Sequence, residues 1–346
     1  MIPGILPNAL NGEPVKRFLW HVNNSKLINR NLKTLNNILS NTARNLKYWL
    51  VCVAVINGFY SCEKSNSTGE PPVVTQDTPA LVSLIHTLPG LLTESSGLCY
   101  TDGNLWSFGD SGNPNAIFKI DTTSGAILQV VTIQNYPNVD WEDITADSSF
   151  IYVGDFGNND GNRKDLKILR IKKSDLDTSS SQLSVNADAI SFSYADQQDF
   201  KVNSNTNFDC EALVAIDSSL YIFTKDGGDF QTRCYQLPKA PGSYQVSPIS
   251  TFNSAGKVTA AAYDQQTHEL ALLGYANGKV NSFLWFFDGF DDRDLFGGSS
   301  KRIKIGSPLT DWQTEGLDYI SSHRLVMSCE TTTSHPAAVY SVEKNL

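Results

Sequence analysis

The chain has 346 residues and a formal net charge of −9 at pH 7. This acidic balance argues against a nucleic-acid-binding surface, which needs clustered lysine and arginine. A hydrophobic content of 40% is enough for a core, and 10% aromatic residues with only 18% charged residues favour strands.

The N-terminal part of the chain predicts an export signal rather than a folded domain. Residues 1–45 show no period, and no methionine lies between Met1 and Met327, which suggests a mis-assigned start and a true start at a non-Met codon further in. Arg44 and Lys47 precede an apolar run of 13 residues, 48–60. Basic residues followed by a short apolar run are typical of a secretory signal peptide, and the run is shorter than the roughly 20 residues that span a bilayer.

The end of this segment, 44–62, resembles a bacterial lipobox, because Ser61 and Cys62 follow the apolar run directly. The resemblance implies lipidation at Cys62, export to the bacterial cell envelope as an outer-membrane lipoprotein, and membrane contact through the lipid anchor only. An ordinary signal peptide and a buried apolar segment stay open as alternatives. Residues 63–79 are rich in Ser, Thr, Pro and Gly and predict a flexible linker.

Residues 80–346 contain a repeat. Each copy begins with a short cluster of residues such as Glu-x-Leu at 211–213, and a polar turn and a second apolar strand follow. Third strands, and in most copies a fourth, come next, so that each unit has about four short strands. Such a pattern predicts an all-β protein, a β-propeller of five blades. The first positions of the five copies are Ser96, Glu142, Glu211, Thr259 and Glu315.

The last copy lacks a fourth strand before the chain ends, whereas residues 81–88 form an apolar strand ahead of the first copy. We therefore expect this N-terminal strand to close the last blade and remove an open sheet edge. The interval of 69 residues between Glu142 and Glu211 leaves a six-bladed ring as the alternative. Since only two convincing strands lie between residues 156 and 200, a long insertion is the preferred interpretation.

The first strand of each propeller blade lines the central channel, so the five first positions are expected to form one ring. Three carboxylates in a narrow channel raise each other's pKa values, and a hard cation removes that conflict. All five residues offer oxygen ligands, which favours Ca²⁺ over Zn²⁺. The alternative is that the glutamates bond neighbouring backbone amides. The predicted metal ligands are Ser96, Glu142, Glu211, Thr259 and Glu315.

This ring resembles that of the calcium-activated nucleotidase (apyrase) family, a family of five-bladed propellers with Ca²⁺ in the central tunnel. The resemblance covers residues 94–320 in outline and is strict only at the ring. It implies Ca²⁺ as a cofactor and a phosphohydrolase activity. The segment Asp110–Asn113 departs from the Asp-Arg-Thr-Gly-like segment of the family, and Thr259 replaces a serine.

A second set of polar residues follows the second strands and is expected to gather at one mouth of the channel. The loops around it are rich in Gly, Asn and Asp, a composition that suits either ligand binding or tight turns. Arg163 and Lys225 are the cations expected to meet an anionic group there. The predicted ligand-binding residues are Asp110, Asp155, Arg163, Lys225, Asp226, Tyr275 and Glu330.

Two further expectations concern packing. Trp141 and Trp312, each just before a ring glutamate, are predicted to pack between blades. The strand assignment separates the cysteines of residues 80–346 by more than disulfide reach, so free and mostly buried thiols are predicted at Cys99, Cys210, Cys234 and Cys329.

The residues leave open whether the protein is an enzyme, and we assign no catalytic residue. One hypothesis is a monomeric binding module with a structural cation, whose partner is a small molecule, a glycan or a protein, and not a nucleic acid. The other is a Ca²⁺-dependent phosphohydrolase of the nucleotidase type, in which Asp110 or Asp155 positions water. The scarcity of cations near the mouth favours binding.

Overall fold

The computed structural model describes residues 73–176, 179–276, 281–305 and 312–344. They belong to one compact unit, Gly69–Leu346. The predicted signal peptide with Cys62 lies outside the described residues. Among the described residues, no helix has the length and apolarity needed to cross a membrane.

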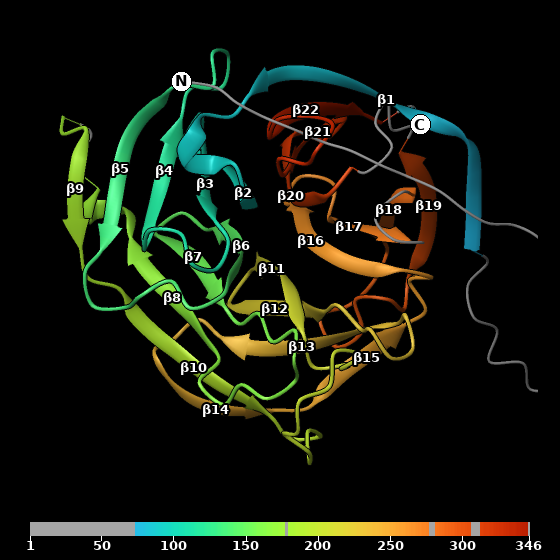
Figure 1. Cartoon of the computed structure of the whole chain (residues 1–346). Helices are drawn as coiled ribbons and strands as arrows, with labels where there is room; N and C mark the ends of the chain where they lie inside the picture. Colours follow the sequence, from blue (N-terminus) through green and yellow to red (C-terminus); the bar gives the residue numbers. More distant parts are fainter. Residues whose placement is uncertain (1–72, 177–178, 277–280, 306–311, 345–346) are drawn as a thin grey trace, which may run out of the picture. The chain divides into compact units, whose positions relative to one another are not determined.

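The described strands form a ring of blades around a central channel (Figure 1), which confirms the predicted all-β propeller. Each inner strand packs beside two others, so that β2, β6, β11, β16 and β20 close a circle. Each is rich in buried residues, as a strand covered on both faces requires. The inner strands are β2 (Ser95–Thr101), β6 (Trp141–Ala146), β11 (Cys210–Ile216), β16 (Lys257–Asp264) and β20 (Thr314–Ser321).

Each inner strand pairs antiparallel with the strand that follows it, and a third strand pairs with the second. The second strands are β3 (Asn104–Gly109), β7 (Phe150–Asp155), β12 (Ser219–Thr224), β17 (Glu269–Ala276) and β21 (Arg324–Cys329). The third strands are β4 (Ala116–Ile120), β8 (Lys167–Lys172), β13 (Thr232–Pro238), β18 (Asn281–Asp288) and β22 (Ala338–Glu343).

The fourth strands divide the described residues into five units and leave none that forms a sixth. Blades 1 to 4 use β5 (Ile127–Ile133), β10 (Asp188–Tyr194), β15 (Pro248–Phe252) and β19 (Ser299–Ile305). Two further strands extend outer edges in parallel: β9 (Gln182–Val185) joins β5, and β14 (Gly242–Val246) joins β10. The long interval between Glu142 and Glu211 therefore includes an extra outer strand for blade 1.

The N-terminal strand β1 (Val73–Thr87) has two partners. Its second part, from Leu81, pairs antiparallel with β22, which confirms the predicted closure of the last blade. Its first part, from Val73, pairs in parallel with β19 of blade 4. The predicted linker, 63–79, is therefore wrong for its last seven residues, because backbone hydrogen bonds to β19 order them as strand.

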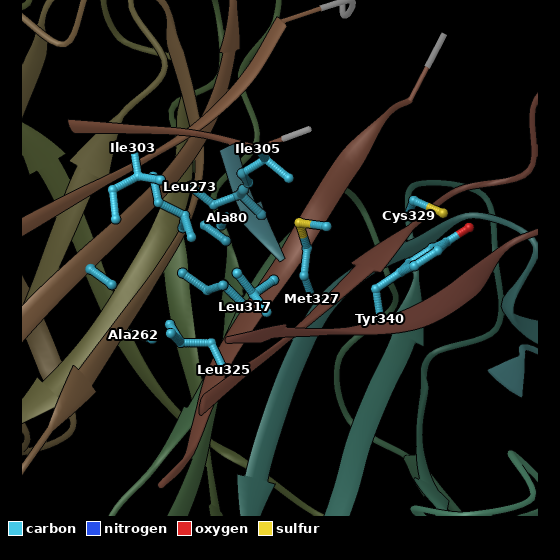
Figure 2. Packing of buried hydrophobic residues seen from close by; sticks show 14 of the residues in the cluster. Ala80, Ala262, Leu273, Ile303, Ile305, Leu317, Leu325, Met327, Cys329 and Tyr340 are labelled. Atoms are coloured by element: carbon cyan, nitrogen blue, oxygen red, sulfur yellow. The ribbon is translucent and has the colours of Figure 1, made fainter. Parts of the chain in front are cut away.

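The core lies between blades, as the cluster between blades 4 and 5 illustrates (Figure 2). Side chains of β1, β19, β21 and β22 meet there, among them Ile303, Met327 and Tyr340. Trp312 is fully buried and meets the Tyr340 ring edge-on at 4.9 Å, and Trp141 meets Phe108 of blade 1 at 5.5 Å. The Trp141 contact crosses from blade 2 to blade 1, and Trp312 belongs to the cluster that blades 4 and 5 share, so both tryptophans pack between blades as predicted.

The four cysteines in the described part of the chain are buried free thiols, as predicted. Burial raises the pKa of the Cys99, Cys210 and Cys234 thiols well above the ordinary value. Buried apolar surroundings of this kind make a thiol unreactive. These cysteines therefore serve packing.

Candidate functional site

A register shift recurs at the start of all five inner strands. On β6, Trp141 and Asp143 have partners on β7, and Glu142 between them is skipped. On β11, Cys210 and Ala212 have partners on β12, and Glu211 is skipped in the same way. The corresponding shifts on β2, β16 and β20 also skip the predicted ring position. Irregularities of this type bend a strand and re-aim a side chain. The sequence thus folds so that the ring residues leave the regular ladder at one end of the channel.

A cavity of about 150 Å³ lies at this end of the channel, and we call it the acidic cavity. Polar side chains make up its described lining, with five carboxylates and one ammonium. Its described walls come from all the inner strands except β16, from the residue before β20, from the end of β17 and from the segments after the other second strands. The lining residues are Ser96, Asp110, Glu142, Asn159, Glu211, Lys225, Tyr275, Gln313, Glu315 and Glu330.

The structure brings the two predicted sets of residues together in this one cavity. Of the ring, Ser96, Glu142, Glu211 and Glu315 line it. Thr259 is absent from its described lining. Its hydroxyl donates to the carbonyl of Thr314 at 2.8 Å, just as the Ser96 hydroxyl donates to the carbonyl of Glu142 at 2.9 Å. Asp110, Lys225, Tyr275 and Glu330 come to the same cavity from the predicted mouth set.

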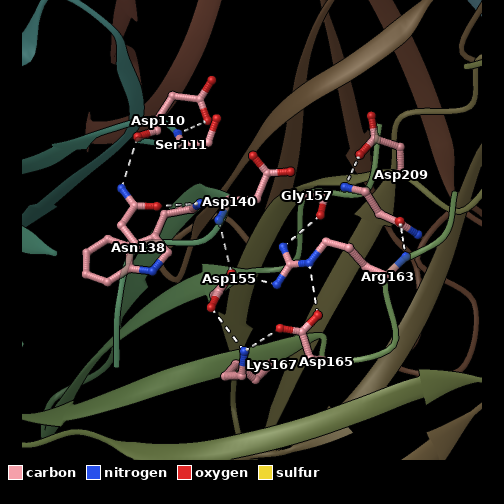
Figure 3. Close-up of polar contacts among 12 residues, drawn as sticks. Asp110, Ser111, Asn138, Asp140, Asp155, Gly157, Arg163, Asp165, Lys167 and Asp209 are labelled. Carbon is pink, nitrogen blue, oxygen red and sulfur yellow. Dashed lines mark hydrogen bonds and ion pairs between the residues drawn. The ribbon is translucent and has the colours of Figure 1, made fainter. Parts of the chain in front are cut away.

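Three other residues of the predicted mouth set do not belong to the described lining of the acidic cavity. Asp155 accepts hydrogen bonds from Arg163 at 2.9 Å and from Lys167 at 3.1 Å (Figure 3). Arg163 also donates to the carbonyl of Gly157, which fixes the loop after β7. Asp226 is fully buried and pairs with Arg233. These ion pairs hold loops in place rather than face a ligand.

Two acidic residues near the cavity escaped the sequence prediction. Asp140 lies just before β6, and its backbone N–H donates to Asp155 at 3.2 Å. Asp209 lies just before β11, and its carboxylate accepts the backbone N–H of Asn158 at 2.7 Å. Both occupy the position two residues before a ring glutamate, as does Gln313. An alignment of the copies at this shared position would have predicted both aspartates as site residues.

Burial and mutual repulsion change the acidity of these carboxyl groups. Burial, and next the carboxylate of Asp110, raise the pKa of Asp140 to about 6. The same two causes hold the pKa of Glu142 well above its ordinary value. Burial also raises the pKa of Asp110. Deprotonation of these groups together is costly unless a cation joins them.

Asp110, Asp140 and Glu142 form a group that suits a metal ion, since each offers an oxygen and these oxygens lie within 4.8 Å of one another. The Ser96 hydroxyl adjoins the group through hydrogen bonds to the Glu142 backbone carbonyl at 2.9 Å and carboxylate at 3.4 Å. An all-oxygen set of this kind fits a hard cation such as Ca²⁺. The residues that suit the cation come from blades 1 and 2 and include only part of the predicted ring.

Gly157 covers this group closely. A Cβ atom at position 157 would overlap a carboxylate oxygen of Glu142 and lie 2.5 Å from one of Asp140. The loop after β7 therefore reaches the carboxylates only because residue 157 has no side chain. Its backbone N–H donates to the carbonyl of Asp140 at 3.1 Å, which fixes the approach.

Tyr275 adds a phenol to the lining of the acidic cavity, and its side chain is 6% exposed. Burial, and next the carboxylate of Glu315, raise its pKa, so the phenol stays protonated. A protonated phenol can donate a hydrogen bond to a group in the cavity.

The comparisons with known proteins show no family for this chain. No family model matches the chain, and no curated protein matches it. Among solved structures, the PQQ-bound aldose sugar dehydrogenase of Streptomyces coelicolor is similar at 10% identity and a TM-score of 0.44, covering 79% of this chain and 99% of that one. An exo-β-1,3-galactanase of Phanerochaete chrysosporium is similar at 11% identity and a TM-score of 0.44, covering 72% of this chain and 59% of that one. Similarities at this level carry no argument about activity, and the propeller is defined by the strand arrangement of the chain itself.

Proposed function

We propose that this β-propeller is a binding module that holds a hard divalent cation, Ca²⁺, in the acidic cavity. The observation that carries the proposal is the meeting of two sets of polar residues in one cavity, whose described lining has five carboxylates and one ammonium. An excess of negative charge in a buried space is stabilised by a cation. Asp110, Asp140 and Glu142 would hold it, with the Ser96 hydroxyl beside them.

The loops around the cavity support a role in binding, because hydrogen bonds join them to one another. The backbone N–H of Asn203 donates to the carbonyl of Asp160 at 2.8 Å, and that of Gly227 donates to the carbonyl of Thr206 at 2.8 Å. These bonds join the loop before β11 to the loop after β7 and to the loop after β12. A rim fixed in this way, with the Tyr275 hydroxyl inside it, suits a small molecule, a glycan or a protein segment.

A Ca²⁺-dependent phosphohydrolase of the nucleotidase type is the second candidate. The feature that favours it is the Asp110 carboxylate, which lines the cavity next to the proposed cation and would position water. The feature that weighs against it is the pairing of the nearby cations: Lys225 bonds Glu211, and Arg163 bonds Asp155. Few positive groups are left to meet the phosphates of a substrate.

Export and anchoring are part of the proposal and rest on the sequence. The segment 44–62 supports a signal peptide, and its lipobox-like end supports a lipid anchor at Cys62. We propose a monomer in the bacterial cell envelope, attached to the outer membrane through this anchor only.

Isothermal titration of the EDTA-treated protein with CaCl₂ tests the proposed function. We expect one bound Ca²⁺ and a rise of several degrees in the melting temperature at millimolar Ca²⁺, since a ligand that binds only the folded state stabilises it. Asp140→Asn should weaken binding at least tenfold. Asp165→Asn is the matched control, because Asp165 is ion-paired but 58% exposed and outside the described lining of the cavity. Absence of binding to the native protein would refute the proposal.

A phosphate-release assay with ATP and ADP in the presence of Ca²⁺ separates the two candidates. The binding module predicts bound Ca²⁺ without turnover. Turnover that disappears in Asp110→Asn and survives in Asp165→Asn would establish the hydrolase instead.

A further inference from the structure

The acidic cavity already contains one positive charge, the ammonium of Lys225. Lys225 directly follows β12, and its backbone N–H donates to the carbonyl of Asp209 at 2.8 Å, which fixes its position. Its Nζ pairs with the carboxylate of Glu211 and lies 3.7 Å from that of Asp209. The side chain is only 12% exposed. The ammonium therefore fills the side of the cavity that belongs to blade 3.

Asp110 and Glu142 also line the cavity, and with the neighbouring Asp140 they form the group that suits a divalent cation. These carboxylates are close enough to the ammonium of Lys225 to interact with it. Burial opposes the charge of Lys225, but the carboxylates of Asp209, Glu315, Glu142 and Asp110 outweigh it and raise the pKa of the ammonium. Since Asp110 and Glu142 stabilise the ammonium, it must in turn repel a cation bound between them.

We propose that Lys225 is a built-in counter-ion that limits the acidic cavity to one divalent cation and lowers its affinity. The inference rests on the proposed cation site. The ammonium neutralises Asp209 and Glu211, which keeps them from serving as metal ligands, and its charge opposes Ca²⁺ across a space of about 150 Å³. Of the predicted ring residues, Glu211 thus pairs with the ammonium of Lys225, whereas Glu142 remains to bind Ca²⁺.

The test compares Ca²⁺ titrations of the native protein, Lys225→Met and Lys225→Arg at pH 8, where the Asp140 carboxyl, with a pKa of about 6, is ionised. Lys225→Met removes the charge and nearly keeps the shape. We expect it to bind Ca²⁺ at least tenfold more tightly or to bind two ions, whereas Lys225→Arg should bind like the native protein. Lys167→Met is the matched control, because Lys167 is a part-buried lysine paired with Asp155 at 3.1 Å outside the described lining of the cavity.

A second readout covers the case in which Lys225→Met folds poorly. Without Ca²⁺, loss of the ammonium leaves buried carboxylates unpaired, so we expect the melting temperatures of Lys225→Met and Lys225→Gln to fall in EDTA and to recover in Ca²⁺ by more than the native protein gains. Folding of Lys225→Met only in the presence of Ca²⁺ would also support the proposal.

The outcomes separate this inference from the proposed function. Native protein that binds Ca²⁺ with the same affinity and stoichiometry as Lys225→Met would overturn the role of Lys225 and leave the cation site intact. Binding by Lys225→Met but not by the native protein would support Lys225 as the counter-ion and refute a Ca²⁺ site in the native protein. Absence of binding to every variant would overturn both.

Discussion

The two ends of the central channel use carboxylates in different ways. At the end where the inner strands begin, the carboxylates of the acidic cavity face one another and the ammonium of Lys225. At the end where the inner strands finish, a second cavity of about 260 Å³ has Asp318 in its lining. Asp318 accepts the backbone N–H groups of Tyr100 at 2.6 Å and Tyr319 at 2.8 Å.

The two ends of the channel differ in the groups that their carboxylates contact. Asp264, also in the second cavity, accepts the N–H of Gln266 at 3.0 Å and the hydroxyl of Thr267 at 2.7 Å. Carboxylates at that end thus serve the backbone of turns and strands. At the acidic end, by contrast, burial and next the carboxylate of Asp110 raise the pKa values of Asp140 and Glu142, whereas burial alone raises the pKa of Asp318.

Asp143 is a buried carboxylate that follows Glu142 in the sequence but bonds the backbone instead of lining the acidic cavity. Its side chain is fully buried and accepts the backbone N–H groups of Leu213 on β11, Ile144 on β6 and, at 3.4 Å, Ala261 on β16. It therefore joins three inner strands across the channel. Gly97 makes room for it, since a Cβ there would lie 3.0 Å from the Asp143 Cα. Asp143 thus has a structural role, whereas its sequence neighbour Glu142 lines the acidic cavity.

The largest effect we expect follows from this structural role. Asp143→Ala leaves backbone N–H groups on up to three strands without an acceptor, and an unsatisfied buried group costs about 1–3 kcal/mol. The free energy of unfolding should therefore fall by about 4 kcal/mol, measured by denaturant titration. Asp160→Ala, on an exposed loop, is the control and should change it by less than about 0.5 kcal/mol. Equal effects of the two would show that Asp143 does not join the strands.

The second effect concerns pH and the far end of the channel. Burial raises the pKa of Asp318 to about 7, above its value of about 4 in an unfolded chain. The folded state therefore binds the proton more tightly, so this stability is present below pH 4 and is lost as the pH rises towards 7. Relative to the native protein, Asp318→Asn should gain about 3 kcal/mol between pH 5 and pH 8, apart from a constant offset for the lost acceptor.

Chemical denaturation at both pH values measures this gain. A difference between native protein and Asp318→Asn that stays constant with pH would contradict a raised pKa at Asp318. It would show that the backbone N–H groups of Tyr100 and Tyr319 are sufficient to keep Asp318 ionised.

The third effect concerns the acidic end. Gly157→Ala places a methyl group against the carboxylates of Glu142 and Asp140, so one of them must move. We expect Ca²⁺ affinity to fall about tenfold, about 1.4 kcal/mol, in a calorimetric titration. Gly90→Ala is the control, because a Cβ there meets no atom within 4 Å. Unchanged affinity in Gly157→Ala would show that the cation does not bind beside this loop.

Much of the fold was predictable, because strand alternation and turn residues repeat along residues 80–346. The closing strand at 81–88 was predictable from counting strands, since one blade lacked its fourth. The parallel pairing of Val73–Gln76 with β19 was not, because an outer edge strand has a polar sequence that looks like a linker. The extra strands β9 and β14 escaped for the same reason.

The ring positions were predictable because equal places in each repeat point the same way. The absence of Thr259 from the described lining of the acidic cavity was not, because the lining depends on side-chain direction at the start of each inner strand. Asp155 and Arg163 were assigned to a ligand, whereas they bond each other at 2.9 Å. An ion pair between oppositely charged neighbours depends on side-chain direction, which residue type and spacing leave open.

Anomalous diffraction from crystals grown with Ca²⁺ tests whether the acidic cavity binds a hard cation. We expect an anomalous peak among Asp110, Asp140 and Glu142, with Lys225 still paired to Glu211. A channel without such a peak at millimolar Ca²⁺, or a peak only at surface carboxylates, would contradict it.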